Sequence, residues 1–74
     1  MNNPREYKFP EVLKALLGER NMSQNKFAFD TDFNQHQVNN WCLGRVMPSL
    51  STLMCLSDYF EVSIDYLVYG DKNI

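Results

Sequence analysis

The first hydrophobic residues of the chain recur three and four positions apart, which is the repeat of an amphipathic helix. The repeat is carried by four aliphatic residues: Val12, Leu13, Leu16 and Leu17. Pro10, just ahead of them, suits a first helical turn, where its missing N–H costs nothing. The pattern therefore predicts a helix over residues 9–20.

Two shorter helices are predicted next, separated by a three-residue break at residues 31–33. Ser23 is an N-cap candidate for a helix over residues 24–30, with Phe27 and Ala28 facing inward. Asn34 is a second N-cap candidate, and Gln37 three residues later completes a capping-box pattern. This helix should run to about Leu43.

The helix after Asn34 has a clear division into two faces. Val38, Trp41 and Cys42 form its apolar stripe, so Trp41 is expected in the core and not as a stacking platform for a base. At about 100° per residue, His36 and Asn40 then point away from the core. Gly44 is expected to end the helix as a C-terminal cap.

Two further helices complete the chain. Pro48 disfavours helical backbone at the preceding residue, and Ser49 is the N-cap candidate for a helix that fades near residues 59–60. Its expected inward residues are Leu50, Leu53, Met54 and Leu56, and Cys55 is expected to be a small buried hydrophobe. Met22, Met47 and Met54 are expected to fill gaps in the packing. Ser63 should cap a last helix over residues 64–68, closed by Gly70.

These elements predict an all-α domain of five short helices. We divide the chain into an N-terminal arm over residues 1–8, the domain over residues 9–70 and a tail over residues 71–74. The composition is globular, with 45% hydrophobic and 22% charged residues in 74. Without a signal peptide or an apolar run long enough to cross a membrane, the expected location is the cytoplasm. Two cysteines give no disulfide framework.

The segment from Met22 to Ser49 resembles the lambda-repressor-like (Cro-type, XRE-type) helix-turn-helix family. The resemblance extends from about Leu13 to Gly70 and rests on these residues: Ser23, Gln24, Phe27, Ala28, Val38, Trp41, Gly44, Pro48, Ser49 and the segment VSIDYLVYG over residues 62–70. Three positions depart from the family pattern. Asp32 stands where the family usually has the glycine of the turn, Thr31 replaces a common leucine, and Cys42 replaces a common glutamate. The loop after the third helix, often basic in the family, has only Arg45.

The resemblance implies a transcriptional regulator that reads double-stranded DNA in the major groove with the helix Asn34–Leu43. Its expected base contacts are Gln35, His36 and Asn40, and its expected backbone contacts are Gln24, Asn34, Gln37, Asn39 and Arg45. Gln24 would also buttress Gln35. From Asn34 to Asn40, five of the seven side chains are amides and none is charged. An amide matches the donor and acceptor on the major-groove edge of adenine, which favours readout of A·T pairs.

The net charge of −2 is unusual for a protein that binds nucleic acid, because phosphate contacts supply much of the affinity. Residues 1–49 carry six basic and five acidic residues (+1), whereas residues 50–74 carry one and four (−3). We therefore expect weak nonspecific affinity and a need for a dimer or a partner.

The resemblance implies a homodimer on a palindromic site, with Tyr66, Val68 and Tyr69 as the expected dimer or partner surface. A small domain of this kind is similar to the repressors of phages and mobile elements. The alternative is a helix-turn-helix module that binds and modulates another protein, such as a repressor. No catalytic, cofactor or metal motif is present, and His36 is not expected to bind a metal.

Overall fold

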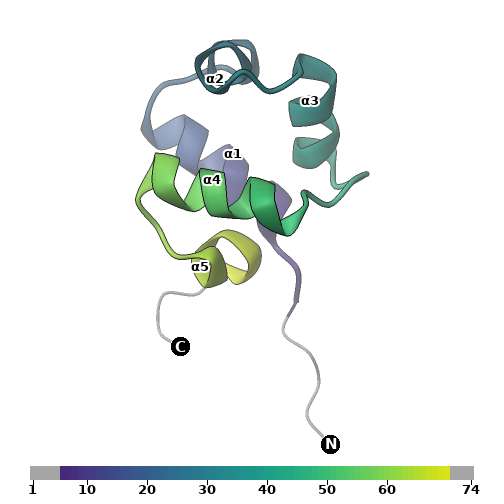
Figure 1. Ribbon diagram of the computed structural model, residues 1–74, viewed down its shortest axis with the longest axis vertical. Helices are drawn as coiled ribbons and strands as arrows, with labels where there is room; N and C mark the ends of the chain where they lie inside the picture. The colour runs from purple at the N-terminus through teal and green to yellow at the C-terminus, as the bar shows by residue number, and fades with distance from the viewer. Residues whose placement is uncertain (1–5, 71–74) are drawn as a thin grey trace, which may run out of the picture.

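The computed structural model describes residues 6–70 and has five helices in that range. They are α1 (Phe9–Glu19), α2 (Gln24–Thr31), α3 (Gln35–Leu43), α4 (Leu50–Phe60) and α5 (Ile64–Tyr69). Figure 1 shows α2 and α3 at one end of the molecule and α5 at the other, with α1 and α4 between them. The predicted all-α architecture of five helices is confirmed. Residues 1–5 of the predicted arm and the predicted tail lie outside the described residues.

Four of the helices begin at a side chain that accepts a hydrogen bond from a backbone N–H of the first turn. These N-caps are Ser23, Asn34, Ser49 and Ser63, each at a position that the sequence predicts. Such caps satisfy N–H groups that have no partner within the helix. The exception is α1, whose N-cap Lys8 makes no side-chain cap bond and which has a proline in its first turn.

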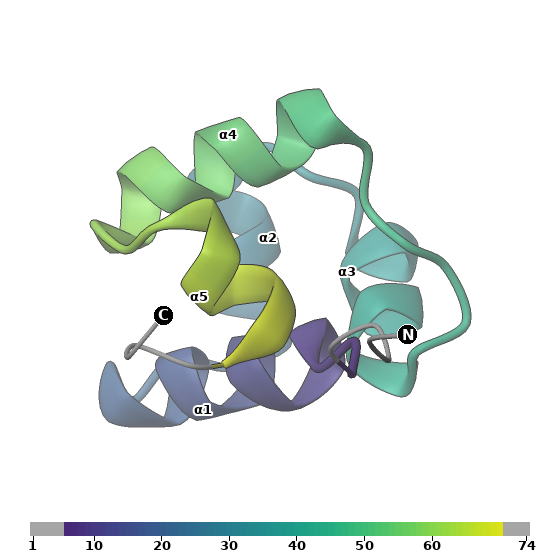
Figure 2. The ribbon, with the colours of Figure 1, turned by 90° about the horizontal axis from the view of Figure 1, so that it is seen from below.

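Figure 2 shows the helices arranged around the middle of the molecule. The core between them is built around aromatic rings. Phe27 of α2 is fully buried, with its ring centre 5.5 Å from that of Phe60 and 5.6 Å from that of Tyr59. Trp41 of α3, 1% exposed, packs edge-on against Phe33 and Phe9. These contacts hold α2 and α3 to α1 and α4, so the pair that carries the predicted DNA contacts is fixed to the rest of the domain.

Two contacts close the domain at the ends of α1. The Lys8 N–H donates to the Val68 carbonyl at 2.7 Å, which attaches the segment before α1 to α5. At the other end, the Arg20 guanidinium lies over the rings of Tyr59 and Phe60, 5.4 and 5.0 Å from their centres. Both contacts join residues that are far apart in the sequence.

The prediction for the inward face of α4 is partly wrong. Leu56 and Phe60 are buried and Leu53 is partly buried, but Leu50 is 66% and Met54 54% exposed. Two apolar stripes run along this helix, one with Leu50 and Met54 and the other with Leu56 and Phe60. The stripe that contains the large Phe60 ring packs into the core. Leu50 and Met54 are thereby turned outward.

Two further burial predictions are corrected by the structure, at Cys55 and Met47. Cys55, expected in the core, is exposed, because it lies about 100° around α4 from the buried Leu56. Met47 is 67% exposed and fills no gap, whereas Met22 packs against the core as predicted. The cysteine at position 42 is buried, and burial raises the pKa of its thiol while the Lys14 ammonium lowers it.

The turn between α2 and α3 has the left-handed backbone that the resemblance implies. Asp32 adopts φ 64°, a conformation that glycine takes without strain and that aspartate tolerates better than most residues. Gly44 and Gly70 end α3 and α5 with φ 76° and 70°, as predicted. None of the helices in the described range is long and apolar enough to cross a membrane.

Candidate nucleic-acid interface

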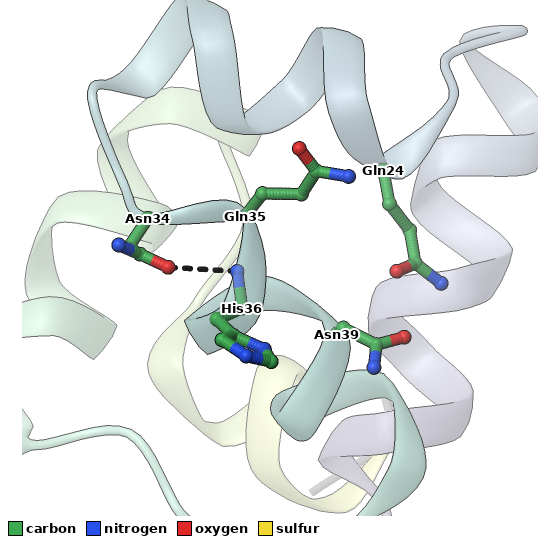
Figure 3. A pocket seen from close by; sticks show the side chains of 5 residues that line it. All are labelled: Gln24, Asn34, Gln35, His36 and Asn39. Atoms are coloured by element: carbon green, nitrogen blue, oxygen red, sulfur yellow. Dashed lines mark hydrogen bonds between the residues drawn. The ribbon is translucent and has the colours of Figure 1, made fainter.

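The first residue of α2 and the N-terminal half of α3 line one open hollow of about 410 Å³. Its lining residues are Gln24, Asn34, Gln35, His36 and Asn39. Figure 3 shows the Gln24 and Gln35 side chains extending from the two helices toward the same space, with Asn39 below them. All five residues are among the predicted DNA contacts, and the fold brings them together.

At this hollow, Asn34 caps α3 with its side-chain oxygen and presents its side-chain amide nitrogen. Its Oδ1 accepts a hydrogen bond from the His36 N–H at 2.7 Å, which caps α3. The capping-box prediction is wrong in detail: this bond goes to His36 and not to Gln37, and no bond returns from the Gln37 side chain within the described residues. With Oδ1 occupied, the Nδ2 amide group is left as a donor, and Figure 3 shows it on the far side of the cap bond.

Buried residues on the opposite face of α3 fix the orientation of the hollow. Val38 is fully buried and Trp41 and Cys42 are nearly so, as the predicted stripe requires. Trp41 is therefore a core residue, and its ring is not available to stack on a base. Residues 35–37, which precede the stripe, are exposed.

The other predicted contacts lie outside the hollow. Gln37 and Arg45 are exposed, whereas Asn40, predicted to point directly away from the core, is half-buried. The Arg45 N–H donates to the Asn40 carbonyl at 3.0 Å, so the chain turns back over this part of α3 after Gly44. Gln24 and Gln35, predicted to support each other, lie close together at the hollow, but no hydrogen bond joins them in the described part of the chain.

Phe29 of α2 is a feature of this end of the molecule that the sequence prediction missed. It is 79% exposed, and with Asn25, Asp32 and Gln35 it lines a second hollow of about 380 Å³. Gln35 therefore lies at the boundary of both hollows. Phe29 is two residues beyond the buried Phe27, about 200° around the helix, and this spacing could have revealed its exposure.

The electrostatic character of the first hollow comes from amides and helix ends. Within the described part of the chain, no carboxylate, ammonium or guanidinium group lines it. The N-termini of α2 and α3 both lie at it, and unpaired N–H groups there favour an anion such as a phosphate. Lys26 of α2 pairs with Asp30 at 3.3 Å, which offsets its charge. No group of three or more potential metal ligands is found within residues 6–70.

Two adjacent helices joined by a left-handed turn, with the second one anchored by a buried stripe and polar on its outer face, define a helix-turn-helix domain. The sequence model of the helix-turn-helix family matches residues 13–67. The chain belongs to this family, in its lambda-repressor-like, XRE-type branch.

Two proteins similar to this chain are transcription regulators. It is 30% identical over 66 residues to the HTH-type transcriptional activator BcrR of Enterococcus faecalis, a match that covers 89% of this chain and 32% of that protein. The crystal structure of a transcriptional regulator from Listeria innocua superimposes with a TM-score of 0.79 at 26% identity, over 93% of this chain and 64% of the other. The chain thus spans about a third of the length of the Enterococcus faecalis protein and just under two thirds of the length of the Listeria innocua chain.

Proposed function

We propose that this chain is a sequence-specific, double-stranded DNA-binding transcription regulator that reads the major groove with α3. The observation that carries the proposal is the hollow between α2 and α3, where predicted base-reading and phosphate-binding residues meet. Family membership and the two regulators described above support it. The major groove is wide enough to admit an α-helix.

Base reading is assigned to Gln35 and His36 in the first turn of α3, with Asn40 one turn later. Gln35 and His36 are exposed at the hollow. The Gln35 amide offers a donor and an acceptor in one plane, which fits the N6 and N7 positions of adenine. Asn40 is half-buried, so we assign it the smaller share of base recognition.

Backbone contacts are assigned to residues around the base-reading ones. Gln24 and the free N–H groups at the start of α2 would bind one phosphate. The amides of Asn34, Gln37 and Asn39 and the guanidinium of Arg45 would bind others. Because only Arg45 is charged among these residues, binding should rely on hydrogen bonds more than on charge.

The regulatory outcome depends on where the protein binds relative to a promoter. We propose repression by occlusion, with two copies on a palindromic site. The similar Enterococcus faecalis protein is named as an activator, so in vitro transcription should be measured with the site both overlapping and upstream of a promoter. Loss of transcript only from the overlapping template is the expected result.

The alternative is a protein-interaction module that modulates another regulator instead of binding DNA. The net charge of −2 and the single cation between α3 and α4 favour it. The two functions separate in co-purification with a candidate repressor and in DNA binding by the isolated chain. Stable retention of the repressor together with absent DNA binding would support the alternative.

The direct test begins with selection of binding sites from random duplex DNA, followed by affinity measurements on the selected and a scrambled site. Gln35→Ala should weaken binding to the selected site by about 1–3 kcal/mol and leave scrambled DNA unaffected. Gln37→Ala is the matched control, since a phosphate contact should weaken both duplexes alike. If selection enriches no sequence, the proposal is wrong.

A further inference from the structure

Phe29 of α2 is more exposed than any other large hydrophobic residue among residues 6–70. Its exposed fraction is 79%, although Phe27 and Ala28 directly before it are buried in the core. The Lys26 ammonium lies 5.9 Å from the centre of the Phe29 ring. By contrast, the three residues predicted as a dimer or partner surface on α5 are half-buried: Tyr66, Val68 and Tyr69. Since a ring left in water gains little from burial, Phe29 contributes little to the fold and its ring is accessible to a ligand.

Phe29 lines the second hollow described above, which we call the Phe29 hollow. Its volume is about 380 Å³, and its lining residues come from α2, the turn and the start of α3: Asn25, Ala28, Phe29, Asp32, Phe33 and Gln35. Ala28 is 5% exposed and Phe33 is partly buried against the core, so packing holds both in place. Together with Phe29 they make half of the lining residues apolar. The hollow can therefore receive a small apolar group without a change in the fold.

Gln35 connects the Phe29 hollow to the first hollow, because it lines both of them. In a helix-turn-helix complex the N-terminal residues of the recognition helix contact base edges, and Gln35 is the first residue of α3. With Gln35 on an adenine, as proposed above, the neighbouring base pair faces the Phe29 hollow.

The charges at the two hollows separate what each can bind. Among residues 6–70, no charged group lines the first hollow, which lies at two helix N-termini and favours a phosphate. Asp32 lines the Phe29 hollow, and its carboxylate has no ion-pair partner in the same range of residues. Because a carboxylate repels a phosphate, the DNA backbone fits the first hollow, and the uncharged edge of a base fits the Phe29 hollow.

We propose that the ring of Phe29 packs against the 5-methyl group of a thymine, in the base pair next to the one that Gln35 reads. This inference rests on the proposed function and adds a specificity-determining residue to it. The thymine methyl is the apolar group on the major-groove edge, where the other recognition positions are hydrogen-bond donors and acceptors. Phe29 thereby selects thymine without a hydrogen bond, and it adds a second A·T pair to the one that Gln35 selects.

The test removes the methyl group and leaves base pairing unchanged. Each thymine of the selected site is replaced in turn by deoxyuridine, and binding of the wild type and of Phe29→Ala is measured on every duplex. The wild type should lose about fourfold in affinity at one thymine beside the Gln35-dependent pair, the effect of one buried methyl-sized group. Phe29→Ala should bind the selected site more weakly and should bind the thymine and deoxyuridine duplexes equally at that position.

Two control variants distinguish a direct contact from an indirect effect. Phe29→Leu keeps an apolar side chain and should keep part of the methyl effect. Gln37→Ala should weaken binding to both duplexes alike, so that the fourfold ratio between them stays. Because Phe29 is exposed, the melting temperatures of its variants should stay close to that of the wild type.

Three results would overturn the proposal and leave sequence-specific DNA binding intact. They are a selected site without a thymine beside the Gln35-dependent pair, a wild type that loses no affinity on deoxyuridine there, and a methyl effect that remains in Phe29→Ala. If selection enriches no sequence at all, the proposed function fails and this inference fails with it. The two failures are therefore distinguishable.

Discussion

Replacing Asn34 tests whether one side chain both caps α3 and binds DNA. In Asn34→Ala the N-cap bond to the His36 N–H, 2.7 Å long, is lost. The position is exposed, so water can solvate the freed N–H and no buried group is left without a partner. The cost in folding free energy should therefore be that of a typical N-cap, about 1 kcal/mol.

The size of this effect is measurable in so small a domain. For a protein of 60–100 residues, 1 kcal/mol lowers the melting temperature by about 4–8 °C. Circular dichroism during heating, or urea unfolding with an unchanged m-value, would measure it. A loss below about 0.3 kcal/mol would refute the assignment of Asn34 as the cap of α3.

Asn34→Asp separates stability from DNA binding at the same position. Its carboxylate can accept the same bond and interacts favourably with the helix N-terminus, so stability should be equal or higher. It has lost the Nδ2 donor and repels phosphate, so DNA affinity should fall by about tenfold or more. If Asn34→Asp binds DNA as well as the wild type, Asn34 does not contact the backbone.

Four other predictions follow: one from the core, one from the turn and two from the thiols. Leu56→Ala should cost about 2–5 kcal/mol in urea unfolding, whereas Leu50→Ala should cost less than about 1 kcal/mol because Leu50 is exposed; equal losses would contradict the burial of α4. Asp32→Val should cost about 1–2 kcal/mol because a β-branched residue tolerates φ 64° poorly, and Asp32→Gly should stay within about 0.5 kcal/mol of the wild type. In the native chain a thiol reagent should modify Cys55 rapidly and Cys42 only on unfolding. Rapid modification of both thiols would contradict the burial of Cys42. Burial raises the pKa of the Cys42 thiol, so the stability that the neutral buried thiol contributes should be present below about pH 8.5 and be lost as the pH rises through the folded pKa. Urea unfolding at alkaline pH should show this loss in the wild type and not in Cys42→Ala.

The helices and their N-caps could be predicted from the sequence because the signals are local. Ser23, Asn34, Ser49 and Ser63 each act on an N–H two or three residues away, so no distant contact can overrule them. The members of the hollow that lie on α3 were also predictable, since their faces follow from the buried stripe of α3, whereas Gln24 of α2 came from the family resemblance. The family resemblance then supplied the expected roles.

The burial of α4 could not be predicted in the same way. Leu50, Leu53, Met54 and Leu56 all fit a helical repeat, and the choice between stripes is made by Phe60, whose ring stacks on Phe27 of α2. That contact joins residues 33 positions apart and is absent from any local pattern. The exposure of Cys55 and Met54 follows from the same choice.

The central claim is best tested by the salt dependence of binding, measured on the selected site and on scrambled DNA. Among residues 6–70, Lys26 near the interface is paired with Asp30, and Arg45 has no ion-pair partner. Each copy should therefore neutralise about one or two phosphates, so log K should fall with log salt at a slope of about −1 to −2 per copy. The account predicts this shallow slope together with a clear preference for the selected site at moderate salt. A steep slope with equal affinity for both duplexes would show binding by charge alone and contradict it.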